Sequence, residues 1–142
     1  MLSDQPIGEF LAALGERTPA PASGAATALT AALAAALVEL AARFADDEES
    51  VPRAKAAVTR LMQLADEDVA AYTDFMADRS KENRARIIAV PEEIAARADE
   101  VAEVGEHVRA ELSSSVAADA EAAVELARAA GRVARRLAQL NA

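Results

Sequence analysis

The stretch RTPAPASGAATALTAALAAALVEL, residues 17–40, places a proline-containing loop directly before a long run of alanine and leucine. The run is apolar on nearly all sides, which predicts a helix from about residue 24 to about residue 44 with other helices around it. Its length would suffice to cross a membrane, but alanine is weakly apolar, Glu39 interrupts the run, and Arg43 and an acidic segment follow it. We therefore expect a buried helix of a globular protein.

The rest of the chain predicts helices as well. Apolar residues recur at helical spacing in residues 3–14, 50–78, 92–111 and in the last segment to residue 140, with a short helix before Pro91, and no segment alternates like a strand. We expect Gly15 to end the first helix with a positive φ, Ser50 and the serines at 113–115 to cap later helices, and Pro91 to bend or restart the chain. The prediction is one all-α domain over residues 1–142, a bundle of long antiparallel helices.

Composition restricts the class of protein and its partners. The 142 residues are 53% hydrophobic but only 3% aromatic, so the core consists of small side chains, and an oligomer would add buried area to it. The net charge of −9 argues against nucleic acid or an anionic membrane as a partner. The chain has no cysteine, and its N-terminus, MLSDQPIGEF, lacks the pattern of a signal peptide, so we expect a cytoplasmic protein without disulfides or thiolate metal sites.

Two groups of polar residues have simple explanations. His107 is the only histidine and follows Glu103 by one helical turn, but this pair is not repeated on a second helix, so no metal site is expected. Arginines follow one face of the last helix, one turn after Glu121 and Glu125, and ion pairs on a solvated surface account for them. These arginines are Arg128, Arg132, Arg135 and Arg136.

Glu39 and the loop before the long helix are candidates for a site. A lone buried carboxyl group is costly to ionise and marks an acid, a base or a ligand contact, whereas an exposed Glu39 would pair with Arg43 one turn later. The loop with Pro19, Pro21 and Gly24 leads into a helix N-terminus, whose free N–H groups attract anions, although an ordinary helix start has the same pattern. The residue pattern alone leaves these alternatives open.

Four segments carry the patterns of one protein family in the same order. FLAALGERTPAPASGAATALTAALAAALVEL is similar to F-L-x-x-L, then P-T-P-G-G-G-S, then an Ala-rich helix ending near L-V-E-M. DEDVAAYTDFMADRSK is similar to a D-x-x-A-Y segment that ends in Pro-Lys, AVPEEIA to a V-P-L turn, and SSSVAADAEAAVELARAAGRVARR to a Ser-Asp step that opens the last helix. Over nearly its whole length the chain therefore resembles the formimidoyltetrahydrofolate cyclodeaminase and methenyltetrahydrofolate cyclohydrolase family.

The resemblance implies a helical domain that dimerises through its long helices and binds folate near the loop and the dimer interface. The implied reaction is loss of ammonia from 5-formimidoyltetrahydrofolate to give the 5,10-methenyl form, or hydrolysis of the methenyl bridge to the 10-formyl form. A lyase or a C–N hydrolase of this kind needs no metal and no cofactor. By position, the implied catalytic residues are Glu39, Tyr72 and Lys81, and the implied substrate contacts are Ala22, Ser23, Gly24, Ser114 and Ser115.

The sequence also departs from the family pattern. The three glycines of the loop map to Ala22, Ser23 and Gly24, and the two methyl-bearing or hydroxyl-bearing replacements should narrow the approach to a ligand. The aspartate of the Ser-Asp step maps to Ser115, and asparagines of the last helix map near Val133 and Leu137. Two alternatives follow: a divergent enzyme acting on a non-folate imine or amidine, with a cavity lined by Glu39 or Tyr72, and a non-catalytic helical dimer without a polar pocket near residues 22–25.

Overall fold

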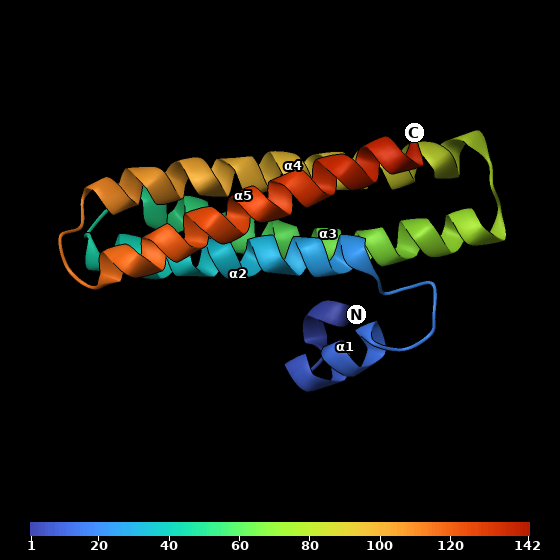
Figure 1. Cartoon of the computed structure of the whole chain (residues 1–142), viewed down its shortest axis with the longest axis horizontal. Helices are drawn as coiled ribbons and strands as arrows, with labels where there is room; N and C mark the ends of the chain where they lie inside the picture. Colours follow the sequence, from blue (N-terminus) through green and yellow to red (C-terminus); the bar gives the residue numbers. More distant parts are fainter.

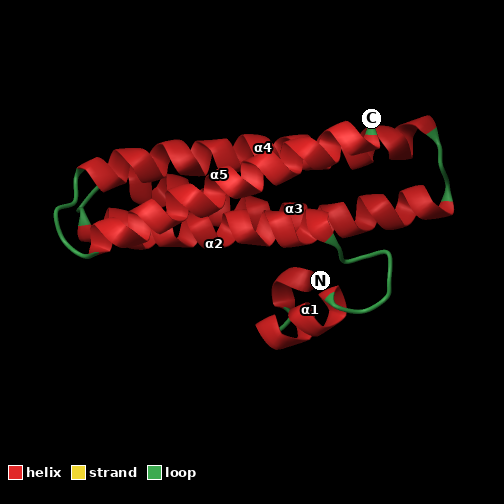
Figure 2. Cartoon of the chain, in the orientation of Figure 1, coloured by secondary structure: helices red, strands yellow, loops and turns green.

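The computed structural model describes residues 1–142 and contains helices and their connections, with no strand. Four long helices form an antiparallel bundle, and a short N-terminal unit lies beside it (Figure 1). Figure 2 shows that short loops join the long helices. The elements are the 3₁₀-helix η1 (Leu2–Asp4), α1 (Ile7–Leu14), α2 (Ser23–Phe44), α3 (Ser50–Ala77), α4 (Lys81–Ala110) and α5 (Val116–Asn141). The predicted all-α bundle is confirmed.

The alanine-rich helix α2 packs against α3, α4 and α5. Its small side chains let these neighbours approach closely, and most of its alanines are fully buried. By length and composition α2 could also cross a membrane, because its mean hydropathy reaches 1.8, yet 56% of that apolar window is buried within the bundle. Its position is that of a core helix, as the sequence predicts.

The ends of three helices differ from the prediction. Gly15 has φ −77° and ψ −8°, so α1 ends without a left-handed glycine. Ser50 is the first residue of α3 and does not cap it; instead the Asp47 carboxylate accepts hydrogen bonds from the Ser50 N–H at 3.0 Å and the Ser50 hydroxyl at 2.7 Å. Ser115 precedes α5 without a side-chain cap, and only the Ser114 hydroxyl accepts a long bond, 3.4 Å, from the Val116 N–H.

Pro91 does not divide the chain, which is the main correction to the predicted helices. It lies inside α4, a single helix of 30 residues. A proline in a helix leaves the carbonyl four residues earlier without its usual N–H partner. Here that carbonyl belongs to Ile87, and the Asn141 side-chain amide at the end of α5 donates a hydrogen bond to it at 2.8 Å. The neighbouring helix thus supplies the bond that Pro91 removes, and α4 continues.

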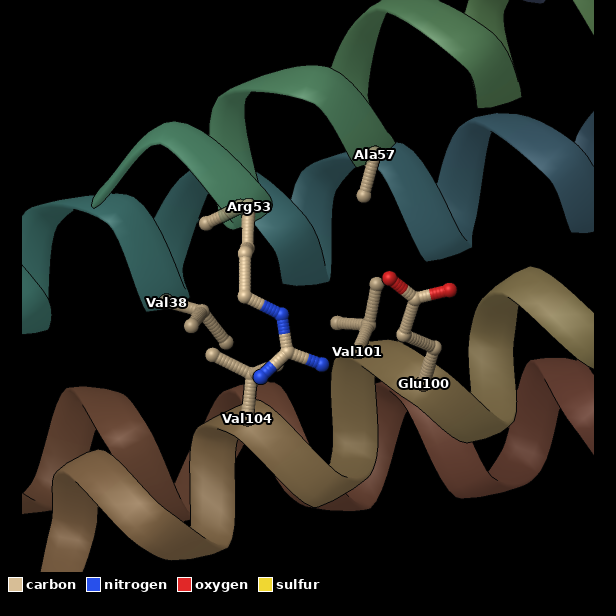
Figure 3. A pocket seen from close by; sticks show the side chains of 7 residues that line it. Val38, Arg53, Ala57, Glu100, Val101 and Val104 are labelled. Carbon is tan, nitrogen blue, oxygen red and sulfur yellow. The ribbon is translucent and has the colours of Figure 1, made fainter. Parts of the chain in front are cut away.

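A narrow gap remains where α2, α3 and α4 meet (Figure 3). It is too small to admit a water molecule, and apolar side chains form most of its wall. Its lining residues are Val38, Arg53, Ala54, Ala57, Glu100, Val101 and Val104. The gap is a packing feature of small side chains and offers no room for a ligand.

Two buried glycines should respond oppositely to the same substitution. A Cβ on Gly105 would lie 2.9 Å from Val124 Cγ2 and 3.3 Å from Val38 Cγ2. Both valines are buried, so Gly105→Ala introduces about 1 to 3 kcal/mol of strain against about 1 kcal/mol of helix propensity. We expect a lower free energy of unfolding in urea.

The matched substitution is Gly131→Ala. A Cβ there would meet Asp99 Oδ1 at 2.9 Å and the Arg135 guanidinium at 3.4 Å, which are the ends of exposed side chains that can turn away. We expect the free energy of unfolding to rise by up to about 1 kcal/mol. A stabilising Gly105→Ala would contradict this prediction, because it would show that Val38 and Val124 move aside for the added methyl group.

Candidate functional site

A shallow pocket of about 160 Å³ opens where the loop before α2 meets α3, α4 and α5. It lies at the end of the bundle where α2 begins and α5 ends (Figure 1). Its lining residues are Pro19, Ala20, Ala22, Ser23, Gly24, Asp68, Tyr72, Pro91, Leu137 and Asn141. Asp68 is the only carboxylate among them, and no histidine joins it, so the lining does not offer a set of metal ligands.

Asp68 of α3 lies against the first turn of α2. Its carboxylate faces the backbone N–H of Ala25, which favours the ionised form of the carboxyl group. That N–H is one of the free donors of a helix N-terminus, and Ala22, at the N-cap position, has no side chain that could satisfy it. Asp68 therefore places a carboxyl group from a neighbouring helix at the start of α2, where a capping residue would lie.

Gly24 allows this close approach. A Cβ on residue 24 would overlap the Asp68 carboxyl group. No glycine of the chain has a positive φ, so Gly24 is required by the packing of Asp68 and not by its backbone conformation. The two replaced glycine positions of the family pattern, Ala22 and Ser23, are exposed.

The environment of Asp68 changes its acidity. Burial raises the pKa of the Asp68 carboxyl group to about 6, and the nearby backbone N–H of Ala25, which favours the ionised form, opposes part of this rise. A carboxyl group that titrates near neutral pH can both donate and accept a proton. Tyr72 follows one turn later on α3 and lines the same pocket. Asp68 is thus the pocket residue best suited to acid–base chemistry.

The structure brings together only some of the predicted site residues. Tyr72, Ala22, Ser23 and Gly24 meet in the pocket. Lys81 is the exposed first residue of α4 and is not part of the lining; at 1.5 Å per residue it lies about 15 Å along the helix from Pro91. Asp68 is not among the predicted site residues, although it begins the D-x-x-A-Y pattern and lies one helical turn before Tyr72.

The remaining predicted residues lie at the other end of the bundle. Glu39 is about 22 Å along α2 from Gly24. Its carboxylate accepts a hydrogen bond from Arg43 Nη2 at 2.8 Å, so of the two interpretations of Glu39 the pairing is the one observed within a single chain. Ser114 and Ser115 are exposed in the connection between α4 and α5, on the side of the molecule away from the pocket (Figure 1).

The arginines of α5 are surface residues, as predicted, but their partners differ. Arg128 pairs with Glu106 at 3.3 Å and Arg135 with Asp99 at 2.9 Å, and both acidic residues belong to α4. Ion pairs within α5 were expected because acidic residues precede the arginines by one turn. The close packing of α4 and α5 provides nearer carboxylates across the interface between the two helices.

A polar pocket near residues 22–25 argues against the non-catalytic alternative, which requires that no polar pocket lies there.

Residues 6–142 match the family described as formiminotransferase-cyclodeaminase. The fold is similar to that of formiminotetrahydrofolate cyclodeaminase from Thermotoga maritima, with a TM-score of 0.92 over 99% of this chain and 80% of that chain and 23% sequence identity. No curated protein matches the sequence.

Proposed function

Because the chain belongs to the formiminotransferase-cyclodeaminase family, we propose that its pocket binds a one-carbon derivative of tetrahydrofolate and closes 5-formimidoyltetrahydrofolate to the 5,10-methenyl form. The observation that carries this proposal is the partly buried Asp68 carboxyl group beside Gly24, with a pKa of about 6, in a pocket with Tyr72. Hydrolysis of the methenyl bridge would use the same groups on a closely related compound.

The reaction needs one proton to move between two nitrogens. N10 of the folate attacks the carbon of the protonated formimidoyl group, which forms the new carbon–nitrogen bond. The amino group then leaves as ammonia with the proton that N10 has lost, and the positive charge remains on the methenyl bridge. Asp68 takes the proton from N10 and gives it to the leaving nitrogen, which suits a carboxyl group with a pKa of about 6.

Tyr72 and Ser23 also line the pocket, and their hydroxyl groups would orient the substrate. The turn around Gly24 presents free backbone N–H groups at the start of α2, where they favour an anionic or carbonyl group of the ligand. Lys81 lies at this end of the bundle but outside the pocket, and the proposed proton transfer does not require it.

A second copy of the chain would complete the site. The pocket of about 160 Å³ is smaller than the roughly 300–1,000 Å³ typical of ligand sites, so one chain covers only part of a folate. Along their lengths, the neighbouring helices α2 and α5 expose large apolar side chains at helical spacing: Leu33, Leu40, Phe44, Leu126, Val133 and Leu140. Leu33 and Phe44 are 61% and 63% exposed. We propose that this α2–α5 face is the interface of a homodimer.

Symmetry then explains why the implied site residues lie at both ends of one chain. In a two-fold dimer the same surface patch of each copy is used, and the two copies of α2 can cross in opposite directions near Leu33. The pocket around Gly24 then faces the end of the partner's α2, with the partner's Glu39 and, beyond it, the α4–α5 connection. We propose that Glu39 acts in the pocket of the partner.

Ligand binding tests the proposed function. Tetrahydrofolate or its 5,10-methenyl form at about 100 times its dissociation constant should add about 2.7 kcal/mol to the free energy of unfolding, which a melting curve detects. The control is Gly24→Ala, whose Cβ displaces the Asp68 carboxyl group; it should melt cooperatively without ligand and lose the ligand-induced shift. No shift for the natural protein would favour the non-folate alternative. An equal shift for both proteins would place folate outside this pocket.

A further inference from the structure

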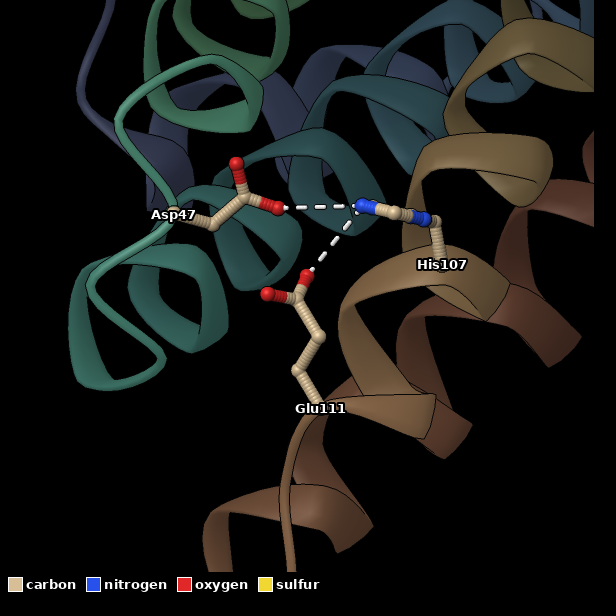
Figure 4. A group of neighbouring side chains, drawn as sticks. All are labelled: Asp47, His107 and Glu111. Atoms are coloured by element: carbon tan, nitrogen blue, oxygen red, sulfur yellow. Dashed lines mark ion pairs between the residues drawn. The ribbon is translucent and has the colours of Figure 1, made fainter.

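Three side chains converge at the end of the bundle opposite the pocket (Figure 4). Asp47 comes from the turn between α2 and α3, His107 from the last turn of α4, and Glu111 directly follows α4. His107 Nε2 lies 3.4 Å from Asp47 Oδ2 and 3.3 Å from Glu111 Oε1. One ligand atom of each residue lies within 4.8 Å of the other two.

These distances are those of ligands around an ion. Two donors bound about 2.1 Å from a tetrahedral metal ion lie about 3.4 Å apart. A charge-assisted N–H···O hydrogen bond would be shorter, about 2.7–2.9 Å. Both carboxylates also face the same imidazole nitrogen, whose single N–H can be directed at only one of them. The two distances from His107 Nε2 to the carboxylate oxygens are therefore compatible with a shared ion and longer than charge-assisted hydrogen bonds.

We propose that Asp47, His107 and Glu111 bind a divalent transition-metal ion. One imidazole nitrogen and two carboxylate oxygens suit Zn²⁺, with water as the fourth ligand. The side chain of His107 is 69% exposed, so the ion can enter from solvent. The sequence predicts no metal site, because Glu103 and His107 on one helix are too few ligands. In the structure, Asp47 joins His107 from another segment, and Glu111 takes the place of Glu103.

Neighbouring groups hold the ligands in place. The side chain of Asp47 is only 9% exposed, and its Oδ2 accepts a hydrogen bond from the Ser50 hydroxyl at 2.7 Å. Such a bond orients a metal-binding carboxylate, and loss of such support typically weakens metal binding. His107 and Glu111 are one turn apart and therefore on the same side of α4.

The surrounding charge favours a cation. Asp46, Glu48 and Glu49 belong to the same turn as Asp47, and the net charge of the chain is −9. A bound ion would also relieve the repulsion between the two carboxylates of the site. The ion would link the α2–α3 turn to the end of α4. This site lies roughly 33 Å along α2 from the pocket. Its expected effect is on stability, and the site does not depend on the proposed folate chemistry.

Zinc titration of tag-free, chelator-treated protein tests the site. Calorimetry should give one Zn²⁺ per chain, and the melting temperature should rise with zinc concentration. Because His107 is the only histidine, its imidazole NMR signals report on the site alone, and they should shift with the same saturation curve. Glu111→Gln and His107→Ala should each weaken binding at least about 100-fold, beyond the usual effect of an outer partner.

The matched control is Glu103→Gln, which removes the same charge from an exposed position one turn before His107 and should leave zinc binding unchanged. The proposal is overturned if His107 signals stay fixed while zinc binds, since the ion then sits elsewhere on the acidic surface. It is also overturned if Glu103→Gln weakens binding as much as Glu111→Gln, or if no zinc binds.

Discussion

Asp68→Asn should reduce turnover of 5-formimidoyltetrahydrofolate by about 10²- to 10⁴-fold, the usual contribution of a general acid–base group. The amide keeps the size of the carboxyl group, and its oxygen can still face the backbone N–H of Ala25, so the pocket and the start of α2 should persist. What is lost is the proton transfer between N10 and the leaving nitrogen. The measurement is the initial rate of methenyl formation at saturating substrate.

The same variant should be more stable than the natural protein at pH 8. The pKa of Asp68 rises from 3.8 to about 6 on folding, so its contribution to stability is present below pH 3.8 and is lost as the pH rises through about 6. Above that pH the natural protein keeps a partly buried carboxylate, and the amide does not. Asp68 is partly exposed, and solvent weakens the effect. We therefore expect the free energy of unfolding of Asp68→Asn to exceed that of the natural protein by about 1 to 2 kcal/mol at pH 8 and to equal it near pH 4.

Asp74→Asn is the matched control for this prediction. It makes the same chemical change on α3, at an exposed side chain that pairs with Arg86 at 2.7 Å. Turnover should stay within about twofold of the natural protein, because an exposed ion pair contributes little. If Asp68→Asn were as active as this control, Asp68 would be only a cap of α2 and the proposed chemistry would need another acid.

Mixing two inactive variants should restore activity if Glu39 serves the partner's pocket. Asp68→Asn lacks the acid, and Glu39→Gln lacks the group that we place across the α2–α5 face. A mixed dimer then has one doubly altered pocket and one pocket with both natural residues. Random pairing makes half of the dimers mixed, so the refolded mixture should show about a quarter of the natural activity.

Two results would contradict the shared site. A Glu39→Gln protein with full activity would limit Glu39 to its observed ion pair with Arg43. A mixture that stays inactive, although both variants are dimers and exchange subunits, would mean that each chain supplies its own catalytic groups. Leu33→Glu, in the middle of the exposed face of α2, should produce monomers and serves as the reference for lost assembly.

Much of the fold could be predicted from the sequence because hydrophobic spacing and helix-ending residues are local properties. The alanine run and the serines at 113–115 predict the bounds of α2 and α5 closely, although the serine side chains do not cap α5 as expected. The predicted break at Pro91 was wrong. A proline normally ends a helix, but here the hydrogen bond that compensates for it comes from the Asn141 side chain on another helix. Local patterns do not contain that partner.

The site was only partly predictable for the same reason. The family resemblance pointed to the turn at residues 22–24 and to Tyr72, which do meet. The importance of Asp68 depends on its approach to Gly24 across two helices, and its pKa depends on burial; neither can be read from spacing. Asp47 joins His107 through the packing of a turn against α4, so residue spacing on one helix does not predict the proposed metal site.

The most direct test of the proposed function is to supply the purified protein with 5-formimidoyltetrahydrofolate and follow methenyl absorbance and free ammonia together. The account predicts that both products appear in equal amounts and that Asp68→Asn, still folded, forms neither at a comparable rate. If the natural protein releases no ammonia and forms no methenyl bridge, while folded and able to bind tetrahydrofolate, the pocket at Gly24 and Asp68 does not perform cyclodeamination.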